Sequence, residues 1–346
     1  MTESDRKSAA MDIMRIIAAF MVVLLHVSAT VFNYSYTAGV VFRISAFFNC
    51  LSRFSVPLFV MISGALWLNP QKKVDTGRLW KRNIVRMFIV YIVWDLIYAV
   101  YNTLAAGKFD RVTFKVNVLN PQYHLWFLPM IIGIYMIIPI LRTWTANATE
   151  REVAIAVAVF MVFYVLRYTI EEYSYSDVVK AIMTDIRIDT FGLYVGYFVL
   201  GYYLAQYGLK SRIKYTVYAI APVGFVLNLM LCIRRSAATQ NPTLSIADSG
   251  FLFTTILAVA VFDLVTEYAK HSKKLPVKAG FYQALSKDMF GVYLSHLLVI
   301  MLFAGKIVDI MPYEFSIPLA TIVTFAVSAL GAAVVRRIPF IGRYIC

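Results

Sequence analysis

The sequence contains few cysteines, few histidines and few charged residues. Its three cysteines lack the paired spacing of a disulfide framework or a metal knuckle. The four histidines are far apart and form no H-x-x-E-H or related zinc pattern. No Walker loop, G-x-G-x-x-G or G-x-S-x-G sequence occurs. These absences argue against a metal site, a nucleotide-binding loop and a hydrolase nucleophile elbow, so we expect no metal cofactor.

Internal repeats and long polar segments are also missing. The absence of a convincing repeat weakens the case for a transporter built from duplicated halves. The longest polar connections, near 107–123, 171–188 and 269–287, are too short to fold alone. We therefore expect a single integral-membrane domain over 1–346.

Apolar residues dominate the composition. Hydrophobic residues make up 60% of the chain, charged residues 15%, and the mean hydropathy is +0.71. The 23 tyrosines and 25 phenylalanines match the aromatic enrichment of bilayer interfaces. Apolar runs of about 20 residues, the length that crosses a bilayer, recur along the chain. We predict an all-α, polytopic membrane helix bundle of about ten transmembrane helices, over 11–32, 44–68, 83–106, 124–141, 152–170, 189–207, 215–233, 249–268, 288–305 and 315–335.

Basic residues predict how the bundle is oriented. With the N-terminus in the cytoplasm, the segments on that side carry most of the lysines and arginines, as the positive-inside rule requires. An even number of helices then places both termini in the cytoplasm. The net charge of +14 therefore does not indicate nucleic-acid binding. Two readings remain open: topology with attraction to anionic membrane lipid, or retention of a polyanionic cytoplasmic substrate.

Arg15 and His26 lie inside the first predicted span. That span is too long for a cleavable signal peptide and carries internal charge. Titratable groups are costly in lipid and are usually functional there. Eleven residues separate the two, which is about three helical turns or roughly 16 Å, so both face the same way. One helix face thus carries a cation near one membrane surface and a potential general base near the middle.

The second and third spans contain Arg53, Pro57 and Asp95. Arg53 either extends to the outer interface or forms a fixed cation in a polar cavity, where it would hold a developing negative charge. Pro57 either bends the helix or exposes a carbonyl to that cavity. Asp95 either orients an imidazole or pairs with Arg53, and we favour the ion pair.

Three further residues are candidates. His124 and Trp126 are expected at the outer surface, either as an interfacial belt or as the lip of an acceptor site. His296 lies near mid-membrane, where it either packs or shares a polar chamber with His26.

Four segments in chain order carry a family resemblance. They are Arg15 and His26 with ten residues between them, Arg53-x-x-x-Pro57-Leu-Phe-x-x-Ile-Ser-Gly64, His124-Leu-Trp126-Phe-Leu, and Phe290-Gly-Val-Tyr-Leu-Ser-His296. Together they resemble the acyltransferase-3 family of bacterial membrane O-acyltransferases over nearly the whole chain. The resemblance implies transfer of an acyl group, usually acetyl from cytoplasmic acetyl-CoA, to a hydroxyl of a surface glycan across the membrane. It also implies a multi-pass protein of the bacterial cytoplasmic (inner) membrane.

By the same resemblance, Arg15 and His26 form the essential pair. The family's arginine pair at the cytoplasmic end of the third helix is matched most nearly by Lys81, Arg82 and Arg86.

Residues and resemblance together predict a mechanism. Arg15, Lys81, Arg82 and Arg86 bind the coenzyme A phosphates at the cytoplasmic mouth, and His26 serves as base or acyl carrier. Either Arg53 or His296 stabilises the oxyanion. The expected acceptor-binding residues are His124 and Trp126.

Two other classes of function stay open. They are a transporter or flippase of a polar or lipid-linked substrate, and a non-catalytic membrane scaffold. A sugar, a lipid-linked glycan, a peptidoglycan unit and an amino acid all offer an acceptor nucleophile.

Overall fold

The computed structural model describes residues 3–37, 39–107, 109–166, 168–170, 190–243, 250–272, 279–339 and 342. Over these ranges the chain is helical and has no strand, which confirms the predicted all-α membrane bundle. Eight of the described helical segments are long and apolar enough to cross a membrane, and a bent pair makes a ninth. The predicted helix over 189–207 corresponds to α11 (Thr190–Gln206), whose 17 described residues fall just short of a full span. The predicted connection 171–188 lies outside the described residues.

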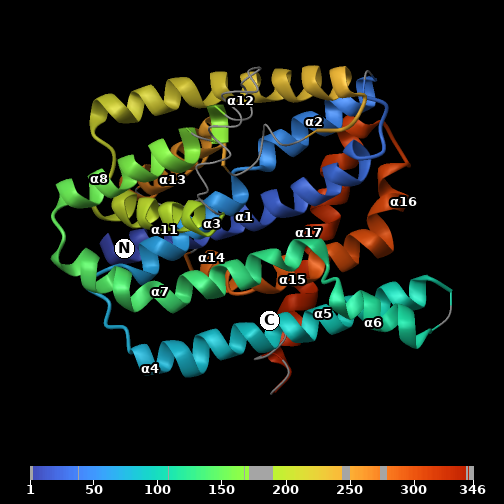
Figure 1. The fold of residues 1–346 in the computed structure, drawn as a ribbon, viewed down its shortest axis with the longest axis horizontal. Coiled ribbons are helices and arrows are strands. Elements are labelled where there is room, and N and C mark those ends of the chain that lie inside the picture. Colours follow the sequence, from blue (N-terminus) through green and yellow to red (C-terminus); the bar gives the residue numbers. More distant parts are fainter. Residues whose placement is uncertain are drawn as a thin grey trace.

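Helix α1 (Glu3–Phe32) runs through the interior of the bundle (Figure 1). It contains neither glycine nor proline, so nothing interrupts its backbone hydrogen bonds, which lipid requires to be satisfied within the helix. It contacts α2 (Val40–Ser52), α3 (Ser55–Trp67), α13 (Leu252–His271) and the elements that follow α13. Two polar residues of α1, Asp12 and Ser28, are buried by these contacts.

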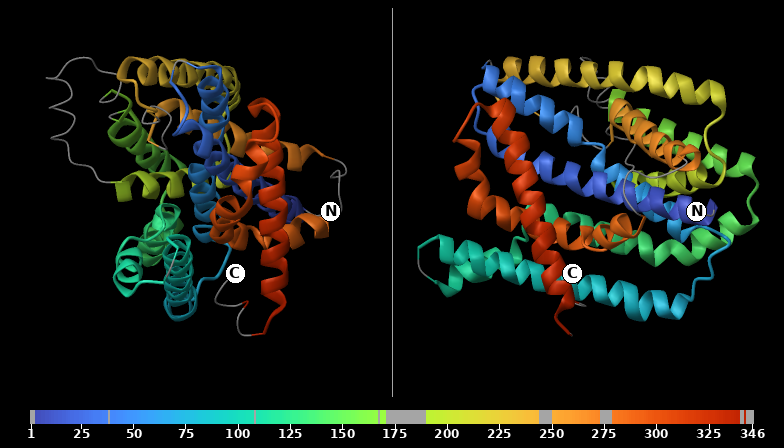
Figure 2. Two further views of the ribbon diagram at one scale, coloured as in Figure 1. Left: turned by 90° about the vertical axis from the view of Figure 1, so that its right-hand side faces the viewer. Right: turned by 180° about the vertical axis from the view of Figure 1, so that it is seen from behind.

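The remaining long helices enclose α1. Helix α12 (Ser211–Thr239) lies along one edge, and α5 (Val85–Ala105) with α6 (Arg111–Leu119) lies along the opposite edge in both views (Figure 1, Figure 2). The other elements are α4 (Thr76–Arg78), η1 (Leu79–Ile84), η2 (Tyr123–Trp126), α7 (Phe127–Asn147), α8 (Glu150–Phe160), η3 (Met161–Leu166), α14 (Ala279–Ser286), α15 (Met289–Val299), η5 (Ile300–Ala304), α16 (Gly305–Val308) and α17 (Tyr313–Arg337).

The second predicted span is broken at Arg53. Helix α2 ends at Ser52 and α3 begins at Ser55, although the two together form one apolar span of 28 residues. Pro57 has no N–H, so it cannot complete the helical ladder across this junction. The break places Arg53 at a turn within the span rather than on a regular helix face.

Helices α3 and α11 pack backbone against backbone. A side chain at Gly64 would overlap the backbone of Phe198, and one at Gly201 would overlap the backbone of Met61. Small residues at such crossings allow close packing of membrane helices. This junction supports the wall of the bundle that faces α1.

Two predicted elements differ in the structure. The polar connection 107–123 contains the additional helix α6, which begins where Asp110 accepts hydrogen bonds from the Thr113 amide and hydroxyl, both at 2.8 Å. These bonds hold the pKa of Asp110 below its usual value. The predicted helix 288–305 is the second part of a pair, α14 and α15, bent by 52°. Capping by a local side chain and a bend near Asp288 are details that hydropathy alone does not predict.

Residues near both ends of the described chain contact the junction between α14 and α15. Arg336, near the end of α17, pairs with Asp288 at 2.6 Å. Ser286, two residues earlier, lies 3.4 Å from Arg15 in the N-terminal half of α1. The placement of both termini in the cytoplasm stays a prediction.

Candidate active site

A cavity of about 760 Å³ lies against α1. Helix α1 lines it with Arg15, Val22, His26, Ala29 and Asn33, among others. The spacings of seven, four, three and four residues keep these side chains on one helix face, and the lined stretch is about 27 Å long. The prediction that Arg15 and His26 share a face is confirmed. The cavity thus runs along most of the depth of the membrane, with His26 between its ends.

His26 is surrounded by aromatic and imidazole rings. Its Nδ1 lies 3.4 Å from the Tyr123 hydroxyl. Its ring centroid lies 5.0 Å from that of His296 and 6.4 Å from that of His124. Three of the four histidines, from α1, η2 and α15, therefore meet at one point. The sequence spreads them over 270 positions, so only the fold brings them together.

His296 is fully buried behind His26 and does not line the cavity. Its Nδ1 lies 2.7 Å from the carbonyl of Tyr293 and 3.2 Å from that of Val292. Carbonyls only accept, so Nδ1 must carry the proton. In the neutral ring Nε2 then holds a lone pair, and it has no hydrogen-bond partner within the described ranges. This arrangement makes His296 an acceptor beside His26 rather than a donor to substrate.

Tyr98 fixes the helix that carries His296. Its buried hydroxyl donates to the Leu294 carbonyl at 2.8 Å and accepts from the Leu298 amide at 3.2 Å. These are the two groups that a regular α-helix pairs with each other. The Tyr98 hydroxyl thus ties α5 to the turn of α15 that contains His296. Neither Tyr98 nor its role follows from the sequence, because the contact joins residues about 200 positions apart.

His124 is not the exposed lip residue that the sequence predicted. Only 2% of its surface is exposed, and its ring lies 5.2 Å from that of His296. The Tyr293 hydroxyl donates to the His124 carbonyl at 2.5 Å and holds η2 inside the bundle. His124 nevertheless lines the cavity, as does Trp126, which is 44% exposed and packs against Tyr194 at 5.5 Å.

Arg53 lines the cavity as a fixed cation. Its Nε donates to the Asn49 side chain at 2.9 Å, and the Asn49 amide donates to the Leu25 carbonyl at 3.1 Å and to Ser28 at 3.2 Å. Asn49, which the sequence did not single out, thereby connects Arg53 to the α1 segment beside His26. Within the described part of the chain, the terminal nitrogens of Arg53 meet no protein acceptor, so they are available to a ligand.

The predicted ion pair between Asp95 and Arg53 is wrong. Arg53 bonds to Asn49 instead, and Asp95 Oδ1 is buried without a hydrogen-bond partner in the described structure. The prediction rested on the similar depth of the two residues in the membrane. Depth does not specify which way each side chain points around its helix.

The predicted coenzyme A residues are divided between two places. Arg15 lines the cavity, bonded to Asp12 at 3.2 Å and near Ser286. Lys81 and Arg82 are exposed, Arg86 is half-buried, and none of the three lines the cavity. Among the described residues of α5, Met87 lines the cavity. Arg86 precedes it and points about 100° away around the helix, because consecutive helical residues differ by that angle.

The described ranges contain no group of three or more His, Cys, Asp or Glu side chains arranged to hold a metal. The three clustered histidines approach through their rings, and His296 already uses Nδ1 on backbone carbonyls. The chemistry available here is therefore that of imidazole, guanidinium and tyrosine hydroxyl.

Comparison with known proteins supplies the family. The model of an acyltransferase domain, Acyl_transf_3, matches residues 8–337. No curated protein and no solved structure matches the sequence. The match covers all four resembling segments and every helix that lines the cavity, and the chain belongs to the acyltransferase-3 family of membrane acyltransferases.

Proposed function

We propose that this protein transfers an acetyl or other short acyl group from cytoplasmic acetyl-CoA to a hydroxyl of a cell-surface glycan or its lipid-linked precursor. One observation carries the proposal: a single cavity follows α1 from Arg15 to Asn33, with His26 between the two ends. Such a cavity lets two large substrates approach one base from opposite membrane faces. Neither substrate then has to cross the bilayer completely.

The donor enters at the Arg15 end. Its nucleotide is polyanionic and costly to move into lipid, so it stays outside the cavity. Lys81, Arg82 and Arg86 lie beyond the cavity wall, where they contact phosphates at the mouth. The thin pantetheine arm extends past Arg15 along the lined face of α1. About 16 Å of helix then separates Arg15 from the thioester beside His26.

His26 acts as the general base. It takes the proton of the acceptor hydroxyl as the oxygen attacks the thioester carbonyl. The C–O bond forms, the C–S bond breaks, and the same proton passes to the departing thiolate of coenzyme A. In the covalent variant of this mechanism, His26 first takes the acyl group and the acceptor then removes it.

Arg53 stabilises the oxyanion of the tetrahedral intermediate. It lines the same cavity as His26, and its terminal nitrogens meet no acceptor among the described residues. His296 was the other candidate, but its Nδ1 proton is held by backbone carbonyls and its Nε2 presents a lone pair. We assign His296 to positioning, because that lone pair favours an N–H of His26 directed toward it. The opposite nitrogen of His26 is then left to act as base.

The acceptor approaches past Trp126, Tyr123 and Tyr194, which all line the cavity. Aromatic faces suit the apolar faces of sugar rings. Within its family the sequence resembles the O-acetyltransferase that acts on enterobacterial common antigen, so a surface glycan is the proposed acceptor class. The bacterial cytoplasmic (inner) membrane is the proposed location.

Substitution of His26 tests the proposal. His26→Ala should reduce acetyl transfer by more than about a hundredfold, the loss expected for a missing general base. Acetyl-CoA affinity, measured by thermal shift on the purified protein, should stay near normal. His271→Ala is the matched control, because that imidazole is exposed on α13 and far from the cavity lining. Near-normal transfer by folded His26→Ala protein would refute the assignment.

A further inference from the structure

A second cavity, of about 510 Å³, opens at the end of the bundle where α1 begins. It lies among α1, α3, α11 and α13. Three cations, Arg6, Lys7 and Lys270, line it, and no carboxylate does. The neutral hydrogen-bonding side chains of the lining are Ser8, Asn69, Gln71, Tyr202, Gln206 and Thr266.

Arg6 has an unused donor in this cavity. One terminal nitrogen donates to the Lys270 carbonyl at 2.5 Å. The Nε is buried and has no hydrogen-bond partner among the residues that the structure describes. A buried donor without a partner costs about 1–3 kcal/mol, and more when it is charged. An anionic oxygen in the cavity would satisfy it.

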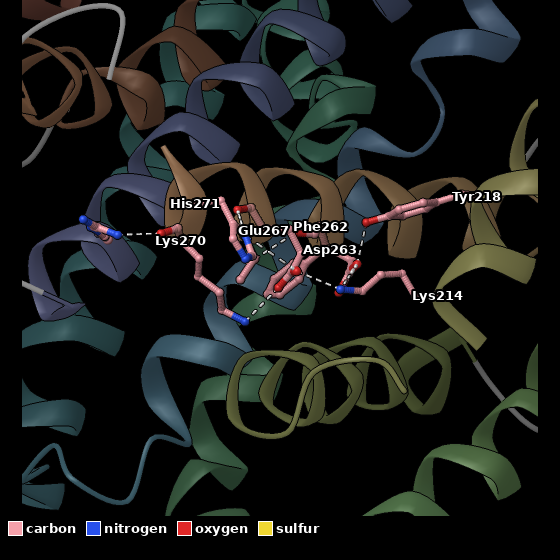
Figure 3. Close-up of polar contacts among 9 residues, drawn as sticks. Lys214, Tyr218, Phe262, Asp263, Glu267, Lys270 and His271 are labelled. Carbon is pink, nitrogen blue, oxygen red and sulfur yellow. Dashed lines mark hydrogen bonds and ion pairs between the residues drawn. The ribbon is translucent and has the colours of Figure 1, made fainter. Parts of the chain in front are cut away.

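Lys270 can turn toward such a ligand without leaving a carboxylate unpaired. Glu267 binds Lys270 through Oε1 at 3.0 Å and Lys214 through Oε2 at 2.7 Å (Figure 3). Because the two lysines use different oxygens, Glu267 keeps the shorter contact when Lys270 moves. Asp263 is also satisfied without Lys270, since the Tyr218 hydroxyl donates to it at 2.6 Å.

The carbonyl groups at nearby helix ends act against anion binding in this cavity. The C-terminal ends of α3, α11 and α13 meet near this cavity, and the carbonyls of helix ends attract cations. Each helix end carries about half a negative charge, and the start of α1 carries a partial positive charge. Arg6, Lys7 and Lys270 set three positive charges against these partial charges and against the Glu267 carboxylate, which Lys270 shares with Lys214.

The second cavity is separate from the catalytic one. Arg6 lies nine residues before Arg15, which is two and a half helical turns, so the two arginines point to opposite sides of α1. A coenzyme A nucleotide bound at Arg6 would direct its pantetheine arm away from His26. A lipid headgroup does not have to reach His26, so it can bind at Arg6.

We propose that this cavity binds a phosphate ester, held by Arg6 and Lys270. The amide and hydroxyl side chains of the lining would bind hydroxyl groups next to the phosphate in the ligand. Two sources supply this chemistry: the headgroup of an anionic phospholipid and a free nucleotide phosphate. The position at the end of the bundle and the separation from His26 favour the phospholipid.

Binding is measured by native mass spectrometry of the full-length protein in neutral detergent. The probes are phosphatidylglycerol, phosphatidylcholine and adenosine 3′,5′-bisphosphate. We expect phosphatidylglycerol to be retained in preference to phosphatidylcholine. The double variant Arg6→Gln with Lys270→Gln should weaken that binding about tenfold, while Lys270→Arg preserves it.

Lys73→Gln is the matched control, since that lysine is exposed and outside the cavity lining. Preferential binding of the bisphosphate, lost in the same double variant, would identify a nucleotide as the source of the phosphate. If the double variant does not fold, the site is tested by measuring phosphatidylglycerol binding to Lys270→Arg and to the unchanged protein at rising salt concentration. Equal retention of all three probes, or equal loss in Lys73→Gln, would overturn the proposal.

Discussion

Tyr98→Phe should impair catalysis far more than it impairs folding. The substitution removes one buried hydroxyl that bridges the Leu294 carbonyl and the Leu298 amide, at 2.8 and 3.2 Å. Once the hydroxyl is gone, these two groups can pair with each other as in a regular helix. Neither is left orphaned, so the loss of stability is about 1 kcal/mol, the net worth of an ordinary hydrogen bond.

Loss of the Tyr98 hydroxyl also removes the contact that holds the His296 turn of α15 against α5. His296 lies between Leu294 and Leu298, and its ring packs 5.0 Å from the ring of His26. A displacement of about 1 Å in a reacting group can cost about a hundredfold in rate. We therefore expect turnover to fall by about ten- to a hundredfold, with acetyl-CoA affinity unchanged because Tyr98 does not line the cavity.

The assay compares three measurements on one set of variants. Acetylation of surface glycans is followed by mass spectrometry in cells that carry each variant, and acetyl-CoA affinity and thermal stability are measured on the purified protein. Tyr101→Phe is the control, because Tyr101 is on the same helix, one turn nearer its end, and makes no hydrogen bond in the described structure. Wild-type turnover by Tyr98→Phe would refute the positioning argument. A matching loss in Tyr101→Phe would show that the effect is not specific.

Four other outcomes are expected. Arg15→Ala should weaken acetyl-CoA binding about ten- to a hundredfold through the loss of a charged hydrogen bond. Unchanged affinity would show that the donor does not bind at Arg15. Trp126→Ala should impair the acceptor-dependent step while acetyl-CoA affinity stays near normal; titrating each substrate separately distinguishes this from a purely structural anchor, which would affect both. Gly201→Val should lower thermal stability by several degrees, because any side chain there meets the facing α3 backbone. A cysteine placed in 72–78 should be labelled only after membrane permeabilisation and one in 111–117 in intact cells, and the reverse pattern would end the coenzyme A argument.

Part of the site was predictable because it depends on one helix. Arg15 and His26 share a face through their spacing alone, since the rise and turn of an α-helix are constant. Hydropathy likewise located most of the spans, because each must bury its own backbone in lipid. Arg53 was recognised as an intramembrane cation from its depth, and the structure places it in the same cavity as His26.

The rest depends on how helices turn toward one another. His124 was assigned to the surface because it begins an apolar run, but the Tyr293 hydroxyl holds its backbone inside the bundle. Asp95 and Arg53 lie at similar depths in the membrane, but Arg53 bonds to Asn49 and not to Asp95. The position of Lys81, Arg82 and Arg86 outside the cavity follows from the rotation of α5, which its own sequence does not specify.

Local physical chemistry along the sequence was therefore sufficient for most of the helices, with ten spans predicted against eight or nine candidates in the described residues, and for the face of α1 that carries Arg15 and His26. The grouping of His26, His124 and His296, the bridge made by Tyr98 and the second basic cavity exist only in the folded molecule. Each joins residues from helices far apart in the chain, and packing between helices, rather than propensity within any one of them, decides which side chains meet.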